Sequence, residues 1–79
     1  MSNDRAADIQ RILTQEDPEF RQWVEEHHRC EDRLHELTTK NQVSTDEELE
    51  EKTLKKRKLH LKDQMAERIR TYETANAVA

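Results

Sequence analysis

The chain has 79 residues and a formal net charge of −4 at neutral pH, with 41% charged and 32% hydrophobic residues. This size allows one domain with a thin core and excludes folds that need a large buried interior. Glycine is absent and proline occurs once. Because tight strand turns and phosphate-binding loops depend on glycine, the composition argues against a β-sheet protein and against a nucleotide site.

A core this small is usually supplemented by a disulfide, a metal or self-association. The single cysteine, Cys30, cannot form an internal disulfide, so we favour self-association. No stretch approaches the roughly 20 apolar residues of a membrane span, and no apolar signal-peptide core follows residues 1–5. We therefore expect a cytoplasmic protein without a membrane partner. The composition suits long helices but is also close to that of a disordered chain, so helical periodicity must decide.

The first expected helix spans about residues 4–15, with Ser2 or Asn3 as its N-cap. Such a short helix is unstable alone in water, so we expect it to dock on another element. Three apolar residues at spacings of three and four give it one apolar face, namely Ile9, Ile12 and Leu13.

The second expected helix spans residues 18–40. Asp17 offers a side-chain oxygen to the free N–H groups at its start, and Pro18 loses no hydrogen bond at the first position. Alternating spacings of three and four then mark the heptad positions that pack along a partner helix, which we call the seam. The seam residues of this helix are Phe20, Trp23, His27, Cys30, Leu34 and Leu37, with Val24 alongside.

The third expected helix spans residues 45–73 and leaves 74–79 as a frayed tail. Two overlapping capping boxes mark its start, Ser44 with Glu47 and Thr45 with Glu48. Its seam includes two cations whose aliphatic stems can cover apolar surface. The seam residues of this helix are Leu54, Lys58, Leu61, Met65, Arg68 and Tyr72, with Ile69 alongside.

Only a few residues separate the two long helices, so they must lie antiparallel as neighbours. We therefore predict a single all-α domain over residues 1–79, in which a short N-terminal helix precedes a two-helix antiparallel coiled-coil hairpin. With the turn centred near Gln42, residues whose numbers sum to about 85 lie opposite each other. This register predicts two apolar contacts, Phe20 with Met65, and Trp23 or Val24 with Leu61.

Charge supports the same register. It places the basic residues between Lys55 and Lys62 opposite three acidic residues of the second helix, Glu25, Glu26 and Glu31. It also places Arg33 opposite Glu50 and Lys52. Exposed pairs contribute only about 0–1 kcal/mol each, so they set the register more than the stability.

Leu59 and Ala66 lie off the seam, on a second ridge that also includes Ile69. A lone hairpin would leave this ridge in water. Either the N-terminal helix covers it, or a second chain does. Leu59 and Ala66 are therefore the candidate residues of a partner surface.

Two stretches resemble the YdcH-like family of small bacterial proteins, a domain of unknown function. One is Asp17-Pro18-Glu19-Phe20 with His27, Glu31 and Leu34, and the other runs from Leu54 to Met65 and contains the more specific Lys58-Leu59-x-Leu61-Lys62-Asp63-x-Met65. Together they span most of the chain between Ile9 and Tyr72. The family more often has leucine at the position of Cys30. The resemblance implies a short helical or coiled-coil protein without assigned activity, and it carries over no catalytic or ligand residue.

Four residues of the second helix invite a zinc interpretation, namely His27, His28, Cys30 and His35. His27, Cys30 and Glu31 can share one helical face, but His28 points elsewhere and the spacing fits no common zinc motif. We therefore expect no metal and no cofactor. His27 is a polar seam residue that fixes register or oligomeric state, with pH sensing opposite Lys58 or a contact with a partner as the alternatives.

Two further residues have a structural and a functional interpretation. Cys30 is expected to be buried rather than reactive, because acidic residues follow it and the seam covers it. Trp23 is most simply a seam anchor, although an open face would make it an anchor for a partner.

A basic stretch is the best candidate for binding a polyanion, and it comprises Lys55, Lys56, Arg57, Lys58 and Lys62. Residues 54–70 carry seven Lys or Arg against two acids, but the rest of the hairpin is acidic. No aromatic residue is interleaved for base stacking. We therefore expect these cations to pair within the hairpin, with nucleic-acid binding as the second hypothesis.

The sequence contains no nucleophile with a matching base and no carboxylate pair with a pocket, so we expect neither an enzyme nor a small-molecule substrate. The leading hypothesis is a non-enzymatic interaction module that contacts a protein partner, or itself as a homodimer, through its helix faces. A nucleic-acid-associated protein using Lys55–Lys62 is the alternative.

Overall fold

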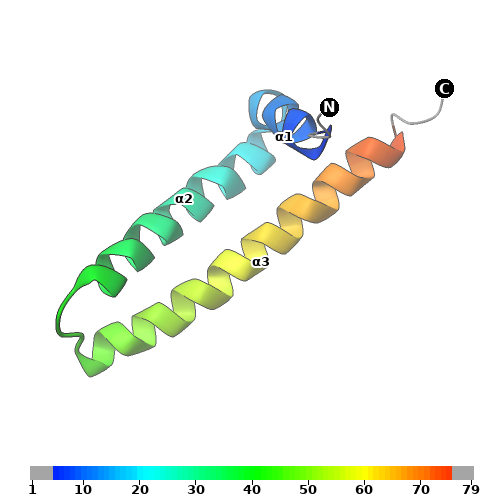
Figure 1. The fold of residues 1–79 in the computed structure, drawn as a ribbon. Coiled ribbons are helices and arrows are strands. Elements are labelled where there is room, and N and C mark those ends of the chain that lie inside the picture. Colours follow the sequence, from blue (N-terminus) through cyan, green and yellow to red (C-terminus); the bar gives the residue numbers. More distant parts are fainter. Residues whose placement is uncertain (1–4, 76–79) are drawn as a thin grey trace.

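The computed structural model describes residues 5–75, which form three helices joined by short connections (Figure 1). Helix α1 spans Arg5–Glu16, α2 spans Pro18–Thr39 and α3 spans Thr45–Ala75. These residues include no strand, which confirms the predicted all-α class. α3 continues past the expected end at residue 73, so Thr74 and Ala75 are helical rather than frayed. The expected N-cap at Ser2 or Asn3 and residues 76–79 lie outside the described residues.

Asp17 alone separates α1 from α2. Its Oδ1 accepts hydrogen bonds from the backbone N–H groups of Glu19, at 3.0 Å, and Phe20, at 3.2 Å, which confirms the predicted N-cap. Arg21 completes the junction from the other side, because its guanidinium donates to the carbonyls of Thr14 and Gln15, both at 2.9 Å. The last turn of α1 thereby gains partners for carbonyls that have none within the helix.

A capping box starts α3. The N–H of Glu47 donates to Ser44 Oγ at 3.2 Å, and the N–H of Ser44 donates to Glu47 Oε1 at 3.0 Å. The overlapping box of Thr45 with Glu48 was the wrong one, because Thr45 is already helical and the N–H of Glu48 bonds the Ser44 carbonyl at 2.9 Å. Lys40 joins the two ends of the loop through a hydrogen bond to Glu47, which lowers the pKa of that carboxyl to about 2.

α2 and α3 lie side by side and antiparallel, and α1 packs across the open end of this hairpin (Figure 1). At that end, Ile9 and Leu13 of α1 form a buried cluster with Phe20 of α2. The remaining members of the cluster are half-buried, namely Trp23, Val24, Met65, Ile69 and Tyr72. Phe20 and Met65 therefore share one core, as the predicted register requires.

The rest of the hairpin has a narrow core. Cys30, Leu37 and Leu61 are buried along it, and residues 5–75 contain no buried polar or charged residue. The molecule measures 55 × 26 × 17 Å, so its thinnest dimension allows little interior. In the described part of the chain, no helix combines the length and apolar character needed to cross a bilayer.

The position of α1 divides the second ridge that we inferred from the sequence. Ile69 packs against the cluster that α1 shares with the hairpin, whereas Leu59 and Ala66 remain exposed. The expectation that α1 covers the ridge therefore holds for Ile69, while Leu59 and Ala66 are left uncovered by α1. Only Leu59 and Ala66 are left without cover from residues 5–75.

Candidate functional site

The predicted seam residues all lie on the inner side of the hairpin or beside it. Four of them are buried, namely Phe20, Cys30, Leu37 and Leu61. The other predicted seam residues are half-buried, namely Trp23, Val24, His27, Leu34, Leu54, Lys58, Met65, Arg68, Ile69 and Tyr72. These residues make the contacts between α2 and α3 and, at the open end, with α1.

Ion pairs fix the register of α2 against α3. Arg57 Nε donates to Glu26 Oε2 at 2.6 Å, and Lys58 Nζ lies 3.4 Å from Glu31 Oε2. Nearer the loop, Arg33 makes a two-pronged contact with Glu50, with Nε–Oε2 and Nη2–Oε1 distances of 2.7 and 2.9 Å. The residue numbers of each pair sum to a value close to 85. These contacts place charged side chains opposite each other as the sequence predicted.

The basic stretch is only partly engaged in these pairs. Arg57 and Lys58 face α2, and Lys55 Nζ lies 3.3 Å from Glu51 on α3 itself rather than facing an acid of α2. Lys56 and Lys62 are exposed and form no salt bridge within residues 5–75, and the same holds for Lys52. The predicted nucleic-acid patch is therefore divided into three engaged cations and two free ones.

The free cations flank Leu59 on what we call the outer face of α3, defined as Lys52, Lys56, Leu59, Lys62 and Ala66. These residues follow one another at spacings of four, three, three and four, so they form one stripe along the helix. Leu59 is 61% exposed, and every other member of the stripe is exposed as well. Leu49 lies one turn before the stripe and is 59% exposed. Its exposure was not predicted from the sequence.

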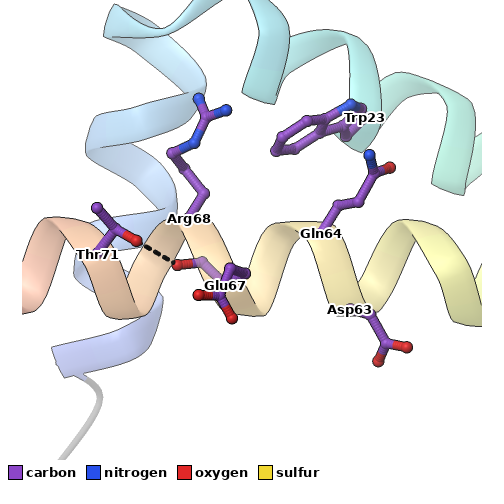
Figure 2. Close-up of a pocket in the computed structure, with 6 residues that line it drawn as sticks. All are labelled: Trp23, Asp63, Gln64, Glu67, Arg68 and Thr71. Carbon is purple, nitrogen blue, oxygen red and sulfur yellow. Dashed lines mark hydrogen bonds between the residues drawn. The ribbon is translucent and has the colours of Figure 1, made fainter.

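An open depression of about 300 Å³ lies between α2 and the second half of α3, and Trp23 forms one wall (Figure 2). Arg68 and Gln64 of α3 point toward the indole side, while the carboxylates of Asp63 and Glu67 point away from it (Figure 2). The Thr71 hydroxyl donates to the Glu67 carbonyl at 3.0 Å, within the helix. The depression brings together no nucleophile with a general base, so its geometry offers no catalytic arrangement.

Arg68 connects this depression to the start of α2. Its guanidinium lies 4.8 Å from the Trp23 ring centre, and it donates to Asp17 and, at 2.8 Å, to Glu19 Oε1. Partial burial acts to raise the pKa of Asp17, but hydrogen bonds from the Phe20 amide and from Arg68 outweigh it, so the pKa lies below the ordinary value of 3.8. The capping residue of α2 is thus held by α3.

His27 is a polar residue of the seam with a side-chain atom that lacks a hydrogen-bond partner. Its side chain is 16% exposed, and its Nε2 is buried without a hydrogen-bond partner in residues 5–75. Nδ1 lies 3.7 Å from Glu31. Burial lowers the pKa of His27 below its ordinary value of 6.5, and the nearby cations Lys58 and Lys62 act in the same direction while Glu31 opposes them.

We expect acid to destabilise the hairpin through His27. Because the folded pKa is depressed, the neutral imidazole contributes its full stability above the unfolded value of 6.5, and this stability is lost as the pH falls through the folded pKa. Urea midpoints measured between about pH 7.5 and about pH 5 should fall in the wild type and fall less in His27→Leu. His28→Gln, at an exposed position, is the control. An unchanged pH slope in His27→Leu would contradict the assignment.

Cys30 is buried and has no partner thiol. Burial raises the pKa of the thiol, and the neighbouring Glu26 raises it further against the effect of Arg57. A thiol in this state is mostly protonated at neutral pH and reacts slowly. Within residues 5–75, no three His, Cys, Asp or Glu side chains converge as metal ligands.

The sequence reasoning did not predict the free state of Lys52, the exposure of Leu49, the role of Arg21 or the contact of Arg68 with Asp17. The contact of Arg68 with Asp17 agrees with the predicted register, since their residue numbers sum to 85. The exposure of Lys52 and Leu49 depends on which side chains α2 leaves uncovered, and the role of Arg21 depends on how α1 meets α2.

A family described as "Protein of unknown function (DUF465)" matches residues 20–69, which is most of the chain. The chain belongs to this family. The DUF465 match covers nearly all of α2 and most of α3 and excludes α1. No curated protein and no solved structure matches the chain.

Proposed function

We propose that this DUF465 protein is a non-enzymatic helical module that acts by protein contact through the outer face of α3. The observation that carries the proposal is Leu59, a leucine that is 61% exposed although the neighbouring Leu61 is fully buried. Single exposed leucines are common, but this one lies in a continuous stripe with Ala66 and three lysines that form no salt bridge within residues 5–75. Such an apolar centre with a charged rim is typical of contact surfaces.

The remaining features support a module that binds rather than reacts. The depression beside Trp23 is open and without a catalytic arrangement, and Arg68 there is already held by carboxylates of α2. We also propose that the chain is one of the YdcH-like proteins within its family, and that it acts in the cytoplasm as a thiol-containing protein without a disulfide.

Nucleic-acid binding is the second candidate, favoured by Lys56 and Lys62, which are exposed and form no salt bridge with any residue from 5 to 75. The pairing of Arg57 with Glu26 and of Lys58 with Glu31 weakens it, because these carboxylates also repel phosphate. A fluorescence-anisotropy titration with short RNA and duplex DNA at low salt tests it. Binding that Lys56→Glu weakens would support it, and no binding would eliminate it.

Site-specific photo-cross-linking in cells tests the leading proposal. A benzophenone side chain at position 62, on the outer face of α3, should give a protein adduct, whereas the same group at the exposed position 29 of α2 should not. Adding Leu59→Glu to the first variant should abolish the adduct, and circular dichroism should show the fold intact because Leu59 is exposed. Absence of an adduct at position 62, or equal adducts at both positions, would contradict the proposal.

A further inference from the structure

We infer, as a deepening that rests on the proposed function, that the outer face of α3 binds an acidic amphipathic helical segment of another protein. The segment from Lys52 to Lys62 contains six Lys or Arg and no Asp or Glu. Three of these cations, Lys52, Lys56 and Lys62, have no salt bridge in residues 5–75 and stand on the same stripe as Leu59. A partner with carboxylates at helical spacing matches this charge.

Leu59 determines the second property of the partner. Its side chain stands between Lys56 and Lys62, one helical turn from each, and Ala66 continues the apolar strip. A purely acidic peptide would leave this leucine in water or place it against carboxylates. An amphipathic helix instead lays apolar side chains on Leu59 and Ala66 while its acidic flanks reach the lysines.

A second copy of this chain fits the face poorly. Two outer faces in contact would bring together six unpaired lysines, because each copy contributes three. The acidic start of α3 is the natural complement in a staggered pair, but most of it is already engaged. Glu47 pairs with Lys40, Glu50 with Arg33 and Glu51 with Lys55. Between Asp46 and Glu51, this leaves only Asp46 and Glu48 without a salt bridge in residues 5–75.

Nucleic acid also fits the face poorly. Phosphates would satisfy the lysines, but nothing in a duplex backbone would cover Leu59 and Ala66. No aromatic residue stands on the outer face of α3 to stack a base. The combination of cations with an exposed leucine therefore favours an acidic amphipathic protein segment.

Fluorescence anisotropy with two matched synthetic peptides tests this inference. Each has about 14 residues, which gives roughly 20 Å of helix, the length of the outer face of α3. The first peptide has leucines at helical spacing among glutamates, and the second has alanine in place of every leucine. We expect the leucine peptide to bind at least about tenfold more tightly than the alanine peptide, a difference of about 1.4 kcal/mol.

Three variants locate the binding. Leu59→Glu and the double variant Lys56→Glu with Lys62→Glu should each weaken binding of the leucine peptide at least about tenfold. Arg29→Glu, at an exposed position on α2, should leave it within about twofold. Equal binding of the two peptides, no binding of the leucine peptide, or full retention in Leu59→Glu would each overturn the inference.

The two proposals fail in different ways. A cross-linked partner at position 62 together with no peptide binding would leave the proposed function standing and remove the acidic amphipathic partner. A cross-linked adduct of twice the 9.5 kDa chain mass would identify a second copy as the occupant and overturn the inference directly. Peptide binding without any cellular adduct would support the chemistry of the face but contradict the proposed function.

Discussion

Phe20→Ala should abolish the stable fold. Phe20 is fully buried and joins α1 to the hairpin through its contacts in the cluster with Ile9 and Leu13. Truncation of a buried phenylalanine costs about 3–5 kcal/mol, which is comparable to the whole stability that a core of this size supplies, about 3–5 kcal/mol. We therefore expect the far-ultraviolet circular dichroism of Phe20→Ala at 25 °C to show largely lost helix, with no cooperative thermal transition.

The matched control is Leu59→Ala, which removes an apolar side chain that is 61% exposed and should change the free energy of unfolding by less than about 0.5 kcal/mol. Both variants are compared at several protein concentrations, because self-association would add stability that depends on concentration. A cooperative transition of Phe20→Ala at the wild-type midpoint would show that the cluster at the open end does not hold the fold together.

The second large effect is expected from Arg68. Arg68→Ala removes the hydrogen bonds to Asp17 and Glu19 and the contact with the Trp23 ring, so we expect a loss of about 1–2 kcal/mol in the free energy of unfolding. Asp17→Ala should cost about 0.5–2 kcal/mol through the lost N-cap. Urea denaturation of both single variants and the double variant measures their coupling, which we expect to exceed about 0.5 kcal/mol.

Acid gives an independent readout of the same contact. The folded pKa of Asp17 lies below 3.8, so its contribution is present above that value and is lost as the pH falls through the folded pKa. Without Arg68, the folded pKa of Asp17 should lie closer to 3.8, so the loss of stability in acid should be smaller and should end at a higher pH. Arg70→Ala is the control, since Arg70 is exposed and its salt bridge within residues 5–75 is to Glu67 on α3 itself. Additive effects of Asp17→Ala and Arg68→Ala would contradict the contact.

Local features of the fold were predictable because neighbouring residues determine them. The cap at Asp17 and the box of Ser44 with Glu47 require only residues within one helical turn. The register followed from a short loop and from charges that had to face opposite charges, as in Arg57 with Glu26. The choice between two capping boxes was harder, because Ser44 and Thr45 carry the same chemistry and differ by one position.

The position of α1 could not be predicted in the same way. Its apolar face could cover any exposed ridge, and Ile69 and Ala66 are both near one end of α3. The structure selects Ile69 because it stands one turn after Met65 and borders the core that contains Phe20. For the outer face of α3, the sequence predicted the exposure of Leu59 and Ala66 but not which neighbouring lysines stay without a salt bridge. Lys55 pairs with Glu51 at a spacing of four that the sequence already contains, whereas only the fold shows that Lys56 forms no salt bridge across to α2 within residues 5–75.

The most direct test of this account is a methyl NMR spectrum of the full chain recorded with a soluble paramagnetic agent that broadens exposed signals. We predict strong broadening at Leu59 and Ala66, and protection of the buried methyl groups of Ile9, Leu13 and Leu61. Protection of Leu59 with broadening of Ile9 and Leu13 would contradict the account, because α1 or a second chain would then cover the face assigned here to a partner.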